Sequence, residues 1–298
     1  MNTPQTDPAA ESVLCGTDFT AASVQAAEVA AAMAKRWGAP LHLVHVSVLP
    51  AYSPMLEELA AGADRLSQTG AEVHHSVLDG NADEAMVAFA KSNSCRLIVV
   101  SALGRRAPER WLLGSTSERT AERASVPTLV VRHAAPLLAW ARGERPLKVV
   151  VAYNRTPTSD AALLWTRELC SVAPCNLTVG YVDFPPDERE RLGGTGPLPL
   201  VGNPPEVQKI LEQEVTSRAT ELLGYGDFAT HVEANWGRPD AALAGMTASV
   251  GADLLVVGSH QYHGFERLWH SSVSRGLLHH CGANILVVPF VTTKSRQG

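Results

Sequence analysis

The sequence lacks the features by which several classes of protein are recognised. No apolar run approaches the length of a membrane-spanning helix, and the polar start, MNTPQTDPAAES, has no apolar centre of the kind a signal peptide needs. With a formal net charge of -5, the chain has no excess of the basic residues that nucleic-acid-binding proteins use. We therefore expect a soluble cytoplasmic protein with no membrane and no nucleic acid among its partners.

Cysteine is scarce and shows no metal-binding or redox motif. The five cysteines are odd in number and form no Cys-x-x-Cys pair. Three of them lie in or beside apolar segments, namely Cys15, Cys95 and Cys281. Buried free thiols are the favoured interpretation of these three residues.

The histidines of the second half do not form a convincing metal site. His260 and His263 are close in sequence, but no cysteine or carboxylate stands at a supporting position in that loop. The adjacent residues His279 and His280 would point about 100° apart on a helix, so one ion could not bind both easily. We expect no metal site.

Motifs of nucleotide-dependent enzymes are also missing. The chain has no SGGxDS loop after its first predicted strand, no HIGH-type pair and no GxxxxGK[ST] loop. No nucleophile and base stand at a spacing that would pair them. We therefore predict no catalytic residues, and a ligase or hydrolase is the less favoured class.

Short apolar runs alternate with helical patterns along the first half of the chain. The predicted strands are residues 12–18, 41–48, 72–78, 96–101 and 128–132. The predicted helices are residues 20–37, 54–69, 83–92 and 115–124. Thr20 is a suitable N-cap and Gly38 a suitable stop for the first helix. Strands that alternate with helices indicate an α/β protein with a parallel, doubly wound sheet.

The pattern starts again after residues 133–146, which contain two prolines and a glycine and are predicted to be a connector. The strands predicted in the second half are residues 147–153, 177–183, a strand ending at 231–235, 253–258 and 285–290. The predicted helices are residues 157–171, 240–250 and 271–280. At 298 residues the chain is long enough for two domains, which we place at 1–140 and 141–298.

Residue numbering shows that the second half duplicates the first. Two early pairs are 136 residues apart: Val46 with Val182 and Asp18 with Asn154. Four later pairs are 157 residues apart: Gly80 with Gly237, Ser101 with Gly258, Ser115 with Ser272 and Val131 with Val288. The difference between 157 and 136 is a net insertion of 21 residues, which we assign to the Pro- and Gly-rich segment 185–205. We interpret that segment as a mobile surface loop.

Residues 97–117, LIVVSALGRRAPERWLLGSTS, contain a candidate anion site. They are predicted to form a buried strand, a loop containing Gly104, and a helix that opens at Gly114 and Ser115. Glycine lets the backbone approach a ligand, and the free amides at a helix start face the same way as the positive end of the dipole. Arg105 is a candidate for phosphate contacts, with a solvated loop residue as the alternative.

This stretch resembles the nucleotide motif of the universal stress protein family, Gly-x2-Gly-x9-Gly-Ser/Thr. In the first half the motif falls on Ser101, Gly104, Gly114 and Ser115, with Ser101 in place of the first glycine. The resemblance covers nearly all of residues 12–290 and is to the tandem form of the family. It implies two Rossmann-like domains of the adenine nucleotide alpha hydrolase-like type.

The resemblance also implies a nucleotide site in the first domain. The turn Thr17-Asp18-Phe19 and the LVHV strand that ends at Val46 are similar to the adenine- and ribose-side residues of the family. In an open parallel sheet such residues meet at the carboxyl ends of the strands. The implied binding residues are Thr17, Asp18, Val46, Ser101, Gly104, Arg105, Gly114, Ser115 and Thr116. The implied cofactor is ATP, with Mg²⁺ left open.

The second half departs further from the motif. Gln261 and Ser271 replace its second and third glycines, and Asn154 stands where the first half has Asp18. Trp269 adds bulk where the backbone would have to approach the ligand. We predict that ATP binds in the first domain only and that the second site is empty or weak.

The leading prediction is therefore an adenine-nucleotide-binding regulatory module of the stress response. A nucleotide-free stress protein that acts by structure or partner binding stays open, as does a weak ATPase. In the family the fifth strands pair across a two-fold axis, so the resemblance implies that the two halves pack as an internal pseudo-dimer. A further homodimer and an unidentified protein partner also stay open.

Overall fold

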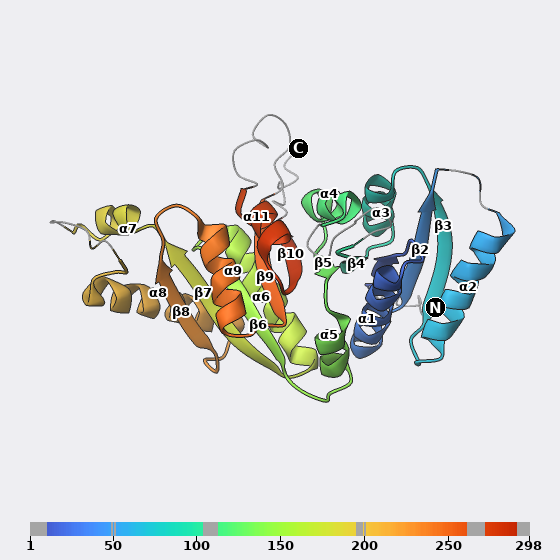
Figure 1. Cartoon of the computed structure of the whole chain (residues 1–298). Coiled ribbons are helices and arrows are strands. Elements are labelled where there is room, and N and C mark those ends of the chain that lie inside the picture. Colours follow the sequence, from blue (N-terminus) through green and yellow to red (C-terminus); the bar gives the residue numbers. More distant parts are fainter. Residues whose placement is uncertain are drawn as a thin grey trace, which may run out of the picture. The chain divides into compact units, whose positions relative to one another are not determined.

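The structure is a computed structural model of the 298-residue chain, and it describes residues 11–48, 50, 52–103, 113–194, 199, 201–260 and 272–290. The chain divides into two compact units, Met1–Arg142 and Gly143–Gly298. Each unit has a parallel sheet with helices on both faces, which confirms the α/β fold (Figure 1). The units are described one at a time below.

The first unit has the strand order β3-β2-β1-β4-β5. These strands are β1 (Val13–Gly16), β2 (Leu41–Ser47), β3 (Val73–Asp79), β4 (Leu97–Ser101) and β5 (Thr128–Val131). The described helices are α1 (Ala21–Trp37), α2 (Ser53–Ser67), α3 (Ala82–Ser92), α4 (Ser115–Arg123) and α5 (Ala134–Ala141). Helices α1 and α2 pack together on one face, α3 and α4 pack together on the other, and α5 lies against α1.

The second unit repeats this arrangement in the order β8-β7-β6-β9-β10. These strands are β6 (Leu147–Tyr153), β7 (Cys175–Asp183), β8 (Ala229–Ala234), β9 (Leu254–His260) and β10 (Asn284–Phe290). The described helices are α6 (Pro157–Val172), α7 (Pro185–Arg191), α8 (Pro205–Leu223), α9 (Pro239–Ser249) and α11 (Ser272–His280). Helix α6 packs with α8, and α9 packs with α11.

The strand register and the helix caps repeat the duplication seen in the sequence. Gly16 pairs with Val44 in the first unit and Ala152 pairs with Gly180 in the second, which keeps the offset of 136. Each first helix starts with a threonine cap, since Thr20 accepts from the Ser23 amide and Thr156 from the Ser159 amide. The same cap therefore directs the chain out of β1 and out of β6.

Residues 133–146 are not only a connector, because helix α5 occupies Ala134–Ala141. Pro136 lies in its first turn, where the missing amide hydrogen breaks no helical hydrogen bond. Leu137 and Trp140 are buried, with exposed fractions of 1% and 0%. Burial of two large apolar side chains against α1 stabilises a helix too short to persist alone.

The interpretation of residues 185–205 as a mobile loop is wrong at the start of the segment. Helix α7 takes up Pro185–Arg191, and Pro185 and Glu188 on it are buried. Helix α8, which follows, has no counterpart among the predicted elements. Its core residues lie at helical spacing: Leu211, Val215, Ala219 and Leu223.

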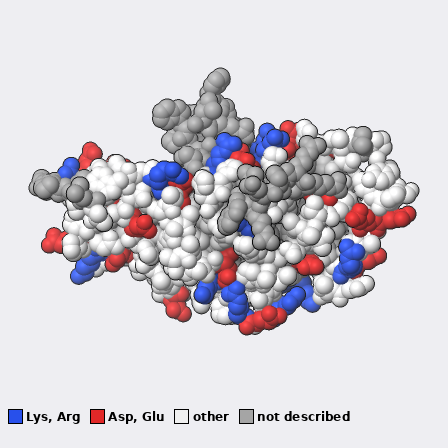
Figure 2. All heavy atoms as spheres, viewed as in Figure 1, with Lys and Arg blue, Asp and Glu red and all other residues white. Residues whose placement is uncertain are grey.

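Charged side chains of both signs are mixed over the face shown in Figure 2, with acidic ones gathered over α2. Among the described helices, none is both long enough and apolar enough to span a membrane. The three cysteines predicted as buried free thiols, Cys15, Cys95 and Cys281, are free and buried.

Candidate functional site

The predicted site residues of the first unit meet at the carboxyl ends of its central strands. Cys15 pairs with Val99, and continuing this register places Thr17 beside Ser101. Gly16 pairs with Val44, which in the same way places Asp18 near the level of Val46. Strand order reverses between β1 and β4, and ligands of open parallel sheets bind at such a point.

A network of hydrogen bonds fixes the turn after β1. The Asp18 carboxylate accepts from the amide and the hydroxyl of Thr20, at 3.1 and 2.6 Å. Phe19 has a left-handed backbone with φ of 65°, and its amide donates to the Thr17 hydroxyl at 3.1 Å. Because an L-residue adopts this conformation only at a cost, these bonds hold a corner that would otherwise relax.

An aromatic pair forms a wall beside this turn. The His45 Nδ1 atom lies 2.8 Å from the Thr17 carbonyl oxygen, so that nitrogen must bear the proton and donate. The rings of Phe19 and His45 are 4.6 Å apart, centroid to centroid, and His45 is 8% exposed. Sequence reasoning did not select this pair, although both residues stand in the segments that it quoted, TDF and LVHV.

The start of α4 closes the other side of the edge. The Gly114 amide donates to the Ala102 carbonyl at 2.8 Å, and the Ser117 hydroxyl donates to the Ser101 carbonyl at 2.6 Å. Gly114 is the N-cap residue and no side-chain hydrogen bond caps the helix, so Ser115 is the first helical residue and not the cap. Ser115 and Thr116 thus stand in the first turn, where amides point out of the helix.

The remaining predicted residues of the motif cannot be placed. Gly104 and Arg105 lie outside the described residues. The Ser101 hydroxyl, which replaces the first motif glycine, donates to the Leu103 carbonyl at 2.8 Å. The serine is therefore engaged with the start of the loop that follows β4.

The corresponding edge of the second unit is filled by its own side chains. Arg155 has φ of 59° and occupies the position of Phe19, while Tyr181 occupies that of His45. The Arg155 guanidinium lies over the Tyr181 ring, 4.8 Å from its centroid, and bonds to the Tyr181 hydroxyl and to Glu188 of α7. The insertion therefore supplies an acidic side chain to the corner that carries a phenyl ring in the first unit.

Glu188 is the centre of this cluster. Its side chain is 5% exposed and accepts from the Tyr181 hydroxyl at 2.5 Å and from Arg191 Nε at 2.7 Å, in addition to Arg155. Burial opposes the charge of Glu188, but these hydrogen bonds hold its pKa below the usual value. Glu214 of α8 pairs with both arginines, at 3.1 and 2.7 Å.

A third acidic side chain lies near Glu188. Asp183, at the end of β7, is 3% exposed and accepts from Asn203 at 2.9 Å. Burial raises the pKa of its carboxyl, and the nearby Glu188 adds to that rise. The second unit therefore places three carboxylates and two arginines where the first unit has a rim of hydroxyls and rings.

Gly258, the best-preserved motif residue of the second unit, is required by packing. A Cβ at this position would lie 2.2 Å from the Thr158 carbonyl oxygen, so the first turn of α6 touches the end of β9 directly. Ser101, its counterpart, has a Cβ, which means that the first unit leaves more room there. Gln261 and Ser271 lie outside the described residues.

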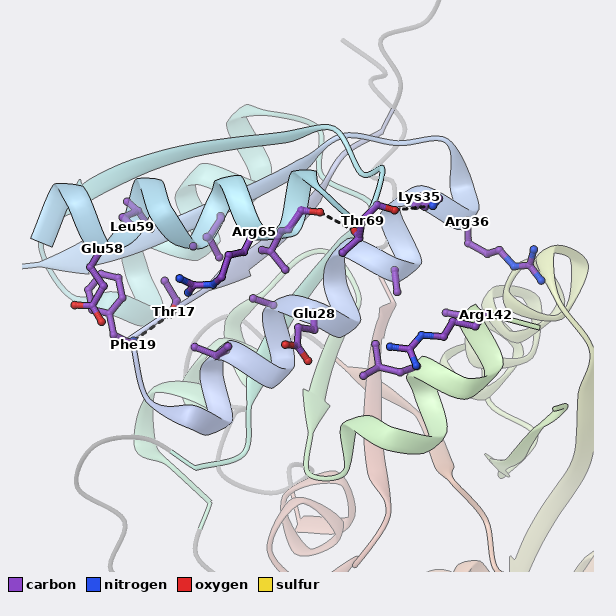
Figure 3. A pocket seen from close by; sticks show the side chains of 18 residues that line it. Thr17, Phe19, Glu28, Lys35, Arg36, Glu58, Leu59, Arg65, Thr69 and Arg142 are labelled. Atoms are coloured by element: carbon purple, nitrogen blue, oxygen red, sulfur yellow. Dashed lines mark hydrogen bonds between the residues drawn. The ribbon is translucent and has the colours of Figure 1, made fainter. Parts of the chain in front are cut away.

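The first unit also has a groove, about 810 Å³ in volume, that runs along α1 between α2 and α5 (Figure 3). It begins near Thr17 and Phe19 and so meets the edge described above. Its lining includes small residues on all three helices, namely Ala27, Ala32, Gly62 and Ala141. Charged side chains of both signs project over it, among them Glu28 of α1 and Arg65 of α2.

Comparison with known proteins accounts for both units. The model of the universal stress protein family matches residues 10–132 and 147–289. A universal stress protein of Methanocaldococcus jannaschii is 30% identical over 139 residues, which are 40% of this chain and 81% of that protein.

Solved structures extend the similarity of fold to almost the whole chain. A universal stress protein of Archaeoglobus fulgidus has a TM-score of 0.66 at 16% identity and covers 93% of this chain and 98% of its own. A putative universal stress protein of Pseudomonas aeruginosa has a TM-score of 0.66 at 17% identity and covers 94% of each chain.

Proposed function

Because this chain belongs to the universal stress protein family, we propose that it is a regulatory stress protein that binds one adenine nucleotide in its first unit. The proposed contacts are those of Thr17, Asp18, Val46, Ser101, Gly114, Ser115 and Thr116. Gly104 and Arg105, which lie outside the described residues, complete the proposed set. ATP is the proposed ligand, and Mg²⁺ is tested with it.

One contrast supports this proposal above all. The first unit has a polar rim at the carboxyl ends of β1 and β4, next to a helix start that no side-chain hydrogen bond caps. Free amides and the helix dipole favour a phosphate at such a place. In the second unit the matching corner is filled by Arg155, Tyr181 and Glu188. A nucleotide there would have to displace a buried ionic cluster.

Titration calorimetry of the full chain with ATP, ADP, AMP, cAMP and dAMP, with and without Mg²⁺, tests the proposal. Two of these ligands are included because solved universal stress proteins have been seen in complex with cAMP and with dAMP. We expect one site per chain. No binding of any nucleotide, or two equal sites per chain, would contradict the proposal.

A matched pair of variants assigns the site to a unit. Asp18→Asn gives the first unit the residue of the second, and Asn154→Asp makes the reverse exchange. We expect the first variant to weaken binding about tenfold, by loss of a charge-assisted hydrogen bond, and the second to leave it unchanged. Gly114→Trp should abolish binding by filling the approach to α4. Equal effects of Asp18→Asn and Asn154→Asp would overturn the assignment.

The groove along α1 favours a second candidate function, a stress protein that binds a partner or small molecule without nucleotide. Its volume lies in the range of small-molecule sites. Native mass spectrometry of the purified full chain separates the two candidates, because a retained adenine nucleotide differs in mass from any other ligand. A phosphate-release assay with ATP tests for the weak ATPase, for which the described residues offer no assigned base.

A further inference from the structure

The groove along α1 differs in charge between its two ends. In Figure 3, Lys35, Arg36 and Arg142 lie at one end of the groove, whereas Phe19 and Glu58 lie at the other. Lys35 and Arg36 stand in the last turn of α1, and Arg142 is the C-cap of α5. Basic side chains therefore gather where these two helices end, away from the carboxyl ends of the strands.

The floor of the groove is apolar and long. Leu43 of β2 and Leu59 and Leu66 of α2 line it and are buried. Between Val24 and Arg36 the groove follows α1 for about 18 Å, because a helix rises about 1.5 Å per residue. A floor of this length and character fits an extended hydrocarbon chain better than a compact polar molecule.

The charged side chains on the rim of the groove do not neutralise one another. Glu28, Arg36, Glu58 and Arg65 have no ion-pair partner in the part of the chain that the structure describes. The lining has four basic side chains against two acidic ones, although the chain as a whole has a formal net charge of -5. This local excess of positive charge favours an anionic ligand.

The second unit bridges the matching place with an ion pair. Helices α6 and α8 correspond to α1 and α2, and Arg218 of α8 bonds to Asp160 of α6 at 2.6 Å. With the offset of 136, Asp160 stands at the position of Val24, which lines the groove. Among the described residues no ion pair joins α1 to α2. The first unit therefore leaves open a space that the second unit spans with its own side chains.

Gly62 keeps the groove open without a packing reason to be glycine. It lies in the interior of α2, where glycine stabilises a helix less than alanine does. A Cβ at this position would lie 3.7 Å from Leu43 Cδ2 and 3.8 Å from Arg65 Nη2, which are ordinary contact distances. Local structure and packing would therefore both accept alanine. Departures of this kind from the local optimum are expected at functional sites.

We propose that the groove binds an anionic amphiphile of the fatty-acid type, with its carboxylate at the basic end and its hydrocarbon chain along α1. Arg36 and Arg142 donate hydrogen bonds to the carboxylate. Lys35 adds charge there, and a hydrogen bond from its Nζ atom to the Thr69 carbonyl at 2.6 Å fixes its place. Removal of the hydrocarbon chain from water drives binding. This names the ligand of the second candidate function and does not rest on nucleotide binding.

Titration calorimetry of the full chain at pH 7 with decanoate, decanol and decylamine tests the proposal. The three amphiphiles have the same chain and differ in the charge of the head group, and each is used below the concentration at which it aggregates. We expect decanoate to bind once per chain and at least about tenfold more tightly than the other two. This comparison uses the unaltered protein, so it does not depend on the folding of any variant.

Variants assign the binding to the groove. Gly62→Phe places a ring over the floor and should weaken decanoate binding at least about tenfold, whereas Gly62→Ala should leave the affinity within about twofold. Arg36→Gln should weaken binding about fivefold by loss of a charge-assisted hydrogen bond. The matched Lys91→Gln, on α3 at the other face of the sheet, should leave binding unchanged. Circular dichroism checks that each variant is folded.

Hydrogen exchange locates the bound chain. Decanoate should slow exchange in peptides from α1 and α2 and leave those from α6 and α8 unchanged. The absence of decanoate binding, equal affinities for decanoate and decanol, or equal affinities of folded Gly62→Phe and Gly62→Ala would each overturn the proposal. A chain that binds decanoate but no ATP contradicts the nucleotide proposal alone, and a chain that binds ATP but no decanoate contradicts this one alone.

Discussion

The corner after the first strand of each unit has the same backbone and is held in two different ways. In the first unit Phe19 is left-handed and its amide donates to the Thr17 hydroxyl. In the second unit Arg155 is left-handed and its guanidinium bonds to Glu188, a residue of the inserted helix. The first unit holds its corner by a bond within the turn, whereas the second unit also holds its corner from the inserted helix α7.

This difference teaches that the edge of a sheet can be altered by an inserted segment as well as by substitution. The exchange of Asp18 for Asn154 removes one charge, but the insertion places a whole cluster over the corner. The four predictions below test the contrast between the units, beginning with the largest expected effect.

Glu188→Ala should reduce the free energy of unfolding of the second unit by about 3 kcal/mol, because two arginines and the Tyr181 hydroxyl lose a buried partner. Urea unfolding followed by circular dichroism measures the loss, and hydrogen exchange of peptides from each unit localises it. Glu190→Ala, on the exposed side of the same helix, is the matched control and should change stability by less than about 0.5 kcal/mol. Similar losses in both variants would show that the cluster contributes nothing specific.

Ser101, at the end of β4, and Gly258, in β9, occupy matching positions, and exchanging them should cost more stability in the second unit than in the first. Gly258→Ser puts a Cβ 2.2 Å from the Thr158 carbonyl oxygen and should cost about 2 kcal/mol through overpacking. Ser101→Gly loses one hydrogen bond and adds backbone freedom, and should cost about 1 kcal/mol. Thermal and urea unfolding of both variants give the comparison. A Gly258→Ser chain as stable as the unaltered protein would mean that α6 does not press on β9.

Asp183→Asn should stabilise the second unit by about 1 kcal/mol at pH 7, since it removes a buried charge and keeps an acceptor for Asn203. The other carboxylate oxygen of Asp183 has no partner among the described residues. Burial raises the pKa of this carboxyl in the folded protein above its pKa in the unfolded chain. The charged carboxylate therefore lowers the free energy of unfolding at pH values above the unfolded pKa, and has no effect once the group is protonated in both the folded and the unfolded state. The gain should therefore shrink as the pH falls towards about 4 and be absent below that pH. Urea unfolding at pH 7 and at lower pH checks this, and a gain that grew in acid would contradict it.

The last prediction is that two cap variants, one in each unit, lose the same amount of stability. Thr20→Ala and Thr156→Ala each remove the N-cap of a first helix and should each cost about 1 kcal/mol. Their costs should agree within about 0.5 kcal/mol, because in both units the cap hydroxyl accepts from the amide of the serine three residues further on. Hydrogen exchange at the start of α1 and of α6 measures both losses. A clear inequality would show that the cluster above α6 also supports its cap.

The fold could be predicted from the sequence because its determinants are local and occur twice. Apolar runs and turn residues mark the strands, and the two constant offsets of 136 and 157 residues show that the second half repeats the first. Helix α5 was missed because Pro136 was taken as a break, whereas a proline in a first turn is tolerated. Helix α8 was missed although its apolar residues have helical spacing, because the proline-rich segment before it suggested a continuing loop.

The positions of the candidate site residues were predictable only where those residues stand at the ends of strands. Thr17 follows β1 and Ser101 is the last residue of the adjacent β4, so topology alone brings them to one level. Arg155 and Glu188 are far apart in sequence, and no periodic pattern indicates that they meet. Contacts of this kind come from tertiary packing, which the pattern of a single sequence does not specify.

The left-handed corner has a consequence for the history of such duplicated chains. The corner requires a left-handed backbone angle, which Phe19 adopts in the first unit and Arg155 in the second. The side chain at this position is thus free to diverge after a gene is doubled, while the course of the chain is preserved. A single codon change at the corner, from an aromatic to a basic residue, alters what the edge of the sheet attracts. One copy can then acquire a new internal partner while the other keeps a different side chain at the same corner.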